Sequence, residues 1–232
     1  MTTQCWNSIR SCTARFTKVD ACGRPVTGAG SVVTTDGYIS IAYKMNLSEG
    51  DEIEQKNACG QLCISDKARD QVKWVDLEIA FCGVNPDAVN LMTGFPVVKD
   101  YAGDNVGFDI ETMSNRSVSG FALEAWTEIP DASPCAPGAF GQWGYFLAPW
   151  AGNGMIGDFT LENGAATFTF MGRTRRGSLW GVGPHLVQAA DVSNTPGPLI
   201  APIRPNGHVR LFKTTVPPPA ITTCAATALV AA

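Results

Sequence analysis

The stretch that decides the fold is QVKWVDLEIAF, from Gln71 to Phe81. Apolar and polar residues alternate along it, and this period of two is typical of a strand with one face buried and one face in solvent. The face predicted to meet the core carries Val75, Leu77, Ile79 and Phe81. Asp76 and Glu78 are predicted on the opposite face. Strands of this half-buried kind belong to antiparallel sheets, so we expect a mainly β protein.

Similar short patterns recur on both sides of this stretch and predict further strands. They are Tyr38–Tyr43, Val106–Glu111, Val118–Trp126, Trp143–Leu147, Phe159–Leu161 and Thr167–Phe170. The turns Thr35-Asp36-Gly37 and Glu162-Asn163-Gly164 have the Asp-Gly and Asn-Gly steps that favour hairpins. With 24 Gly and 15 Pro in the chain, a long uninterrupted helix is not expected.

One short helix is expected after the strand at Gln71–Phe81. Asn85 is a suitable N-cap, Pro86 fits the first turn, and Gly94 is a suitable stop. Asp87 would lie at the positive end of the helix dipole. The apolar face of this helix is predicted to plug one end of the sandwich and to consist of Val84, Ala88, Leu91 and Met92.

A chain of 232 residues suits one large β-domain, which we place at residues 1–192. Residues 193–232 form a proline-rich arm and tail that we assign to the same domain. This arm contains TPGPLIAPIRP and VPPPA, and X-Pro steps favour extended backbone. We therefore expect an arm or a covering strand there, followed by an uncharged tail.

The charge pattern excludes several classes of function. The net charge is −4, and the basic residues are scattered except for Arg173, Arg175 and Arg176, so tight nucleic-acid binding is not expected. The start of the chain lacks the pattern of a secretory signal, and no apolar stretch approaches the length of a membrane span. We expect a protein that is made in the cytoplasm and does not enter a membrane.

The eight cysteines are predicted to be reduced thiols, since the chain is neither short nor visibly secreted. They are Cys5, Cys12, Cys22, Cys59, Cys63, Cys82, Cys135 and Cys224. Cys59 and Cys63 are the closest pair, but a structural zinc site needs a second pair or two histidines. No metal and no other cofactor is expected.

Catalytic patterns are not evident, so we do not expect an enzyme. His185 and His208 are flanked by Gly or Pro and are interpreted as ordinary loop residues. Carboxylates recur at strand positions, namely Asp76, Glu78, Asp109, Glu111 and Glu124. They form a solvated face, an acidic surface with a collective purpose, or the pair that a glycoside hydrolase requires. The six tryptophans serve either core and interface packing or a carbohydrate platform.

The segment from Asp36 to Val98 resembles the major tail tube proteins of long-tailed phages that infect actinobacteria. The matching features are the early strand from DGYISIAY, a charged segment with NACGQLC, the strand KWVDLEIAF and the helix start CGVNPDAV. The turn GRTRRG, from Gly172 to Gly177, fits more loosely, and the resemblance is weak after Val187.

The resemblance implies an antiparallel β-sandwich or barrel of the phage tail tube type with one short helix. Subunits of that family form hexameric rings that stack into a tube, the conduit for genome ejection, and contact other tail proteins in the virion. DNA passes through the acidic lumen without specific binding. The alternatives are another virion component, such as a tail-end or decoration protein, or a carbohydrate-binding β-sandwich.

Two sets of residues follow from this resemblance together with the strand pattern. The candidates for facing the lumen are Asp76, Glu78, Glu111 and Glu124. The position that matches the family's inter-ring loop is Met45 to Asp70. Its charged residues, which suit a polar contact between rings, are Glu49, Asp51, Glu52, Glu54, Lys56, Asp66, Lys67, Arg69 and Asp70.

Overall fold

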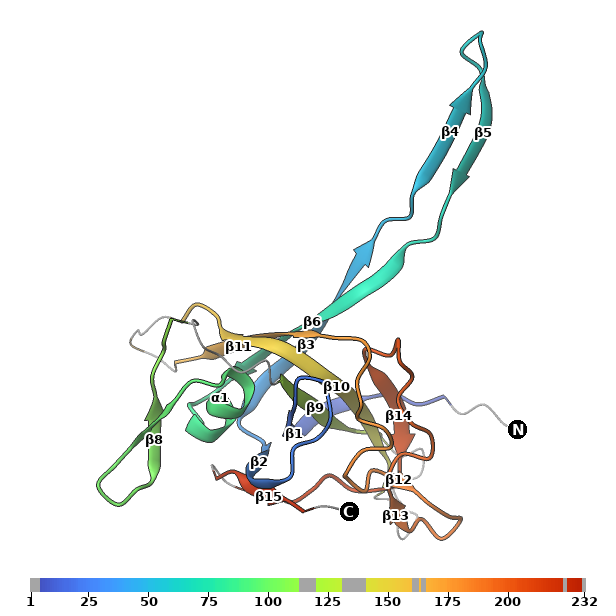
Figure 1. Cartoon of the computed structure of the whole chain (residues 1–232). Helices are drawn as coiled ribbons and strands as arrows, with labels where there is room; N and C mark the ends of the chain where they lie inside the picture. The colour runs from blue at the N-terminus through green and yellow to red at the C-terminus, as the bar shows by residue number, and fades with distance from the viewer. Residues whose placement is uncertain are drawn as a thin grey trace.

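The computed structural model describes residues 5–112, 120–130, 141–159, 163, 166–222 and 225–230. It confirms a mainly β protein with antiparallel sheets and one short helix, as in a β-sandwich (Figure 1). The strands of the main sheet follow the order β15 (Thr227–Leu229), β2 (Gly28–Thr35), β1 (Ile9–Val19), β9 (Gly120–Glu128), β10 (Trp143–Ile156), β11 (Phe168–Thr174), β6 (Gln71–Phe81) and β3 (Tyr38–Ser48), with β14 (Arg210–Thr214) also paired to β10. Smaller two-stranded sheets pair β4 (Glu52–Lys56) with β5 (Leu62–Lys67), β7 (Val97–Lys99) with β8 (Asn105–Phe108), and β12 (Gln188–Ala189) with β13 (Pro196–Gly197).

The alternation in β6 is confirmed. Its four apolar residues at positions 75, 77, 79 and 81 are buried, while Asp76 and Glu78 remain partly exposed. The buried side chains meet Phe16 of β1 and Phe121 of β9 in one core cluster. The outer part of the sheet therefore folds back over β1 and β9, and this enclosure keeps β6 in a single register.

The central strands differ from β6 because both of their faces are covered. On β1, Phe16 points into the cluster that contains the buried side of β6, whereas Val19 belongs to a second cluster. Tyr145, Leu147 and Trp180 are members of this second cluster. A strand that is buried on both sides loses the simple alternation of polar and apolar residues.

The helix prediction is confirmed by α1 (Pro86–Thr93). The side chain of Asn85 accepts a hydrogen bond from the backbone N–H of Ala88 at 3.0 Å, and Gly94 ends the helix with a φ of 74°. A left-handed residue at this position favours glycine. The prediction that Val84 belongs to the apolar face of this helix was wrong, because Val84 precedes the cap and is exposed. Val89 is buried on that face.

Some strand boundaries differ from the expectations. The expected strand Val106–Glu111 is shorter and is β8, whereas the expected Trp143–Leu147 extends to Ile156 through two irregularities in its pairing. Residues 118–119 of the expected Val118–Trp126 lie outside the described part of the chain. The same holds for residues 160–161 of Phe159–Leu161, and Phe159 itself is not in a strand.

The same five-residue turn recurs four times within the described residues. An Asp or Asn at its first position accepts hydrogen bonds from the backbone N–H groups of the third and fifth residues. Its fourth residue has a positive φ, which favours Gly or Asn. The four turns are Asp20–Arg24, Asn57–Gln61, Asp100–Asp104 and Asp191–Thr195. The spacing of Asp or Asn before Gly or Asn is a signal that the sequence patterns above do not use.

The proline-rich C-terminal segment lies against the body of the sheet. Strand β14 pairs with β10, and β15 pairs with β2. Leu199, Ile203 and Val216 are buried, so the segment supplies core side chains as well as edge strands. Its extended backbone follows the surface, as X-Pro steps favour.

Candidate assembly interface

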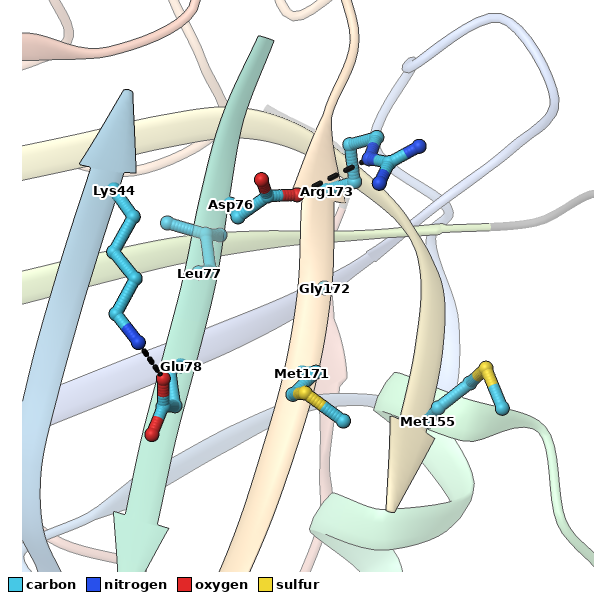
Figure 2. Close-up of a pocket in the computed structure, with 8 residues that line it drawn as sticks. All are labelled: Lys44, Asp76, Leu77, Glu78, Met155, Met171, Gly172 and Arg173. Carbon is cyan, nitrogen blue, oxygen red and sulfur yellow. Dashed lines mark hydrogen bonds and ion pairs between the residues drawn. The ribbon is translucent and has the colours of Figure 1, made fainter. Parts of the chain in front are cut away.

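The outer face of β3, β6 and β11 is one candidate surface for assembly. In the strand register, Lys44 of β3 lies opposite Asp76 of β6, and Asp76 lies opposite Arg173 of β11. Figure 2 shows these side chains around a shallow cavity of about 380 Å³. Its lining residues are Lys44, Asp76, Leu77, Glu78, Met155, Met171, Gly172 and Arg173.

The carboxylates on this face are matched by cations from neighbouring strands. The Nε–H of Arg173 donates to Oδ1 of Asp76 at 3.1 Å, and Lys44 forms an ion pair with Glu78. The guanidinium of Arg173 also lies over the ring of Trp74, at 4.2 Å from the ring centre. Asp76 and Glu78 thus lie at the surface, but Arg173 and Lys44 neutralise their negative charges. The surface that was expected to be acidic therefore has equal numbers of positive and negative charges at these four residues.

Glu111 does not share this face. It is exposed and lies beyond the end of β8, in the coil that follows the hairpin of β7 and β8. That hairpin is separate from the main sheet. The prediction that Glu111 lies on a strand was wrong, because pairing with the short β7 ends at Phe108.

Glu124 was predicted to face the lumen, and this prediction was wrong. Its side chain is fully buried and is the direct cross-strand partner of Arg15. Arg15 binds both carboxylate oxygens, with Nε and a terminal nitrogen each 2.7 Å away. The hydroxyl of Tyr145 donates a further hydrogen bond at 2.5 Å. Glu124 is in a central strand, and the face of the sheet that carries its side chain is covered by other parts of the chain. The side chain therefore points into the protein and not toward solvent.

The electrostatics of this buried pair favour the ionised carboxylate. Burial alone raises the pKa of Glu124, but the Arg15 charge and its hydrogen bonds outweigh burial and hold the pKa below its usual range. Burial and the neighbouring carboxylate raise the pKa of the Tyr145 hydroxyl well above its ordinary value. The cluster is therefore a fixed ion pair with a neutral donor beside it, which is a structural arrangement.

His185, which lies between β11 and β12, completes this cluster and is not an ordinary loop residue. Its Nε2 lies 3.0 Å from the hydroxyl oxygen of Thr17 and 3.7 Å from Oε2 of Glu124. Burial lowers the pKa of His185 to about 4, so the ring is neutral near pH 7. The segment after β11 is thus held on the sheet partly through an uncharged imidazole. His208, by contrast, is partly exposed and bonded to Thr174.

The segment from Met45 to Asp70 was expected to be a loop, and most of it is a β-hairpin. Strand β3 continues to Ser48, and β4 and β5 then form a ribbon that projects far from the body (Figure 1). Every residue from 51 to 73 is exposed. The charged residues named above for this segment, from Glu49 to Asp70, all lie along the stem and ribbon. Cross-strand hydrogen bonds thus order a segment whose composition alone resembles a solvated loop.

The two faces of this ribbon differ in chemistry. Directly paired residues share a face, and the register places Ile53 with Asp66 and Gln55 with Ile64 on one of them. The other face carries Glu52 paired with Lys67 and Glu54 paired with Ser65, and the register then shifts before Lys56, which is paired with Leu62. Nearer the body, aliphatic side chains on the stem are also exposed: Met45 at 71%, Leu47 at 51% and Val72 at 45%. The hairpin therefore presents an aliphatic set that the single chain does not cover.

Strand β3 also ends the main sheet. It pairs with β6 on one side, and within the described residues it is the last strand in the order. Its second edge therefore has backbone N–H and C=O groups that are open to another strand.

The described residues that could bind a metal, form disulfides or stack on sugars are not gathered into a site. Cys5, Cys12, Cys22, Cys59, Cys63 and Cys82 are exposed free thiols, and the expectations for Cys135 and Cys224 lie outside the described residues. The described residues contain no group of three or more His, Cys, Asp or Glu that could hold a metal ion. Trp126, Trp150 and Trp180 are buried, which leaves them unsuitable as a sugar-stacking platform.

In comparisons with known proteins, no family model and no curated protein sequence matches this chain. Within the described part of the chain, no helix has the length and apolar character to cross a membrane. The features that point to function are therefore the geometric ones, namely the projecting hairpin, the open edge of β3 and the balanced outer face.

Proposed function

We propose that this protein is a structural subunit that assembles with copies of itself into stacked hexameric rings, forming the tail tube of a long-tailed phage. The observation that carries the proposal is the projecting hairpin from Met45 to Asp70. The number six, the virion and the conduit rest on the resemblance to tail tube proteins. Self-association rests on the contacts and exposures described above.

The hairpin supports association because an isolated ribbon of two strands is only marginally stable in water. This one extends away from the body and keeps Ile53 and Ile64 more than half exposed. Burial of apolar surface contributes about 25 cal/mol per Å², so a neighbour that covers these side chains stabilises both the contact and the ribbon. The charged opposite face remains suited to water or to polar contacts that set register.

The edge of β3 supports association of a second kind. An open strand edge pairs readily with another strand, and a ring of subunits removes such edges by closing on itself. A subunit with an open edge at β3 and a projecting arm at β4 and β5 has separate means of sideways contact and of contact along an axis. A tube made of stacked rings needs both.

The balanced outer face is compatible with a surface that DNA passes. Affinity for nucleic acid comes mainly from cations that neutralise phosphates and release counterions. Lys44 and Arg173 are already engaged by Glu78 and Asp76, so they are poor phosphate anchors. A wall of this kind lets a polyanion slide without being held.

The experiment that tests the proposal compares the complete chain with a variant that lacks residues 51–67. Gly50 and Ala68 can be joined because their backbones lie close together, and the N–H of Ala68 donates to the carbonyl of Asp51 at 2.9 Å. We expect the complete chain to give rings or tubes in electron microscopy and sedimentation. The shortened variant should keep its melting temperature and give monomers or single rings.

Point variants separate the aliphatic face from the charged face. Ile53→Ser combined with Ile64→Ser should weaken tube formation, whereas the matched control, Glu54→Gln combined with Lys56→Gln, should have little effect. Tubes of normal length from the shortened variant would place stacking elsewhere in the chain. A complete chain that stays monomeric at every concentration would contradict the proposed function itself.

A further inference from the structure

A second hairpin, formed by β7 and β8, carries a fully exposed aromatic side chain, Tyr101. Tyr101 is at the tip of this hairpin, in the turn Asp100–Asp104, and its side chain is as exposed as in an extended peptide, at 104%. The turn itself is well defined: Oδ1 of Asp100 accepts hydrogen bonds from the N–H groups of Ala102 and Asp104 at 2.8 and 2.9 Å. Nothing in this turn requires an aromatic residue at the second position, where the equivalent turns have Ala or Val.

The surroundings of Tyr101 are acidic. Residues 97–111 contain the carboxylates Asp100, Asp104, Asp109 and Glu111 and a single cation, Lys99. The tip is therefore an aromatic ring flanked by negative charge, on a two-stranded support that is tied to α1 by the hydrogen bond from Asn105 to Asp87. Exposed tyrosines of this kind are frequent anchors of protein interfaces, since they bury a large area with little loss of rotamer freedom.

A groove of the opposite character lies on β14 and the segment before it. Its volume is about 390 Å³, and it is lined by Ile203, Arg204, Gly207, Val209, Arg210 and Leu211. Arg210 is fixed by hydrogen bonds to the carbonyl oxygens of Ala201 and Pro202, at 2.5 and 2.7 Å, and these neutral acceptors leave its positive charge uncancelled. Arg204 is exposed at the rim. The groove thus offers aliphatic walls with two cations.

We propose that the tip of the β7–β8 hairpin of one copy occupies this groove on a second copy. The Tyr101 ring would lie against Ile203, Val209 and Leu211, and Asp104 would face Arg204. The size of the groove is within the range of pockets that enclose small molecules, so it admits one phenol ring. The charges are complementary in sign, which favours correct orientation and a fast encounter.

The contact has to be made between copies. In Figure 1 the β7–β8 hairpin and β14 lie at opposite ends of the body, so the tip cannot reach the groove of its own chain. A contact between two different patches is heterologous, and repetition of it closes into a ring or continues as a filament. The inference rests on the proposed self-assembly and adds a specific pair of surfaces to it, away from the long β4–β5 ribbon.

The experiment is sedimentation equilibrium of the complete chain and of five variants. Tyr101→Ala should raise the concentration needed for association by about tenfold or more, as expected for removal of an interface anchor. Asp104→Arg and Arg204→Glu should each weaken association, and the two together should restore it. Val192→Ala is the matched control, because Val192 is at the same position of the equivalent Asp191–Thr195 turn and is equally exposed, at 101%.

The variants change solvent-exposed side chains and should leave the melting temperature unaltered. As an independent measurement, a benzophenone amino acid at position 101 should crosslink to residues 203–211 of another copy. If the complete chain associates but Tyr101→Ala behaves like Val192→Ala, or if the charge swap does not restore association, this contact is wrong and the proposed function stands. If the complete chain does not associate, both fall.

Discussion

Two arginine–carboxylate pairs in this protein are chemically alike and differ in their surroundings. Arg15 and Glu124 are cross-strand partners in the central part of the sheet, and the glutamate has no exposed surface. Arg173 and Asp76 are cross-strand partners near the edge, and their side chains are 49% and 38% exposed. The first pair is thus part of the core and the second part of a surface. The environment of a pair, and not its residue types, decides whether it belongs to the core or to the surface.

The largest effect that this comparison predicts is for Glu124→Gln. The substitution leaves the Arg15 guanidinium buried without a negative partner, and breaking a buried pair in this way costs about 3–5 kcal/mol. Chemical denaturation should show this loss in the free energy of unfolding. The combined variant Arg15→Met, Glu124→Leu and Tyr145→Phe removes the ion pair together with the hydroxyl that donates to it, and it should recover much of the lost free energy. A loss below about 1 kcal/mol for the single variant would mean that water reaches the pair.

The second effect is on pH dependence and comes from His185 beside the buried pair. Its pKa is about 4 in the folded protein against an ordinary value of 6.5, so the unfolded chain takes up a proton first as the pH falls. Stability that is present above pH 6.5 is therefore lost progressively toward pH 4. At about 1.4 kcal/mol per pH unit, the loss between pH 7 and pH 5 is roughly 2 kcal/mol.

Denaturation at a series of pH values checks this dependence. His185→Gln should flatten the curve between pH 7 and pH 5, since it removes the titrating ring while keeping a polar side chain near Thr17. His208→Gln is the control and should flatten the curve less: burial lowers the pKa of His208 too, but this ring is more exposed and is hydrogen-bonded to Thr174, away from the pair. Equal slopes for His185→Gln and the unchanged protein would mean that the imidazole is solvated.

The smallest effect is expected for the exposed pair. Asp76→Asn should change the free energy of unfolding by less than about 1 kcal/mol, because solvent screens this interaction. The Asp76 carboxylate accepts hydrogen bonds from Trp74 Nε1 and Arg173 Nε, both at 3.1 Å, and the amide oxygen of Asn can still accept one of them. The difference should shrink further in high salt. A loss similar to that of Glu124→Gln would show that the outer face is covered in solution, as it would be within a stable assembly.

The sequence predicted much of the local structure for reasons that are themselves local. The alternation from Val75 to Phe81 identified the buried face of β6, and Asn85 with Gly94 identified the ends of α1. A cap or a period of two depends on residues a few positions apart, so it can be read without the fold. The repeated turn with Asp or Asn before Gly belongs to the same class, and its spacing could have located two projecting hairpins.

The candidate surfaces required the tertiary structure. A period of two shows that Asp76 and Glu124 point away from neighbouring apolar residues, but it does not show what covers that side. Only the topology reveals that the C-terminal segment lies over β9 and that β11 brings Arg173 to Asp76. The near-continuous apolar run FALEAW around Glu124 was a sign of a strand buried on both faces. The sequence by itself determined the buried face of β6 and the two ends of α1, because those signals are local, whereas packing between distant segments decided which polar side chains became core and which remained at the surface.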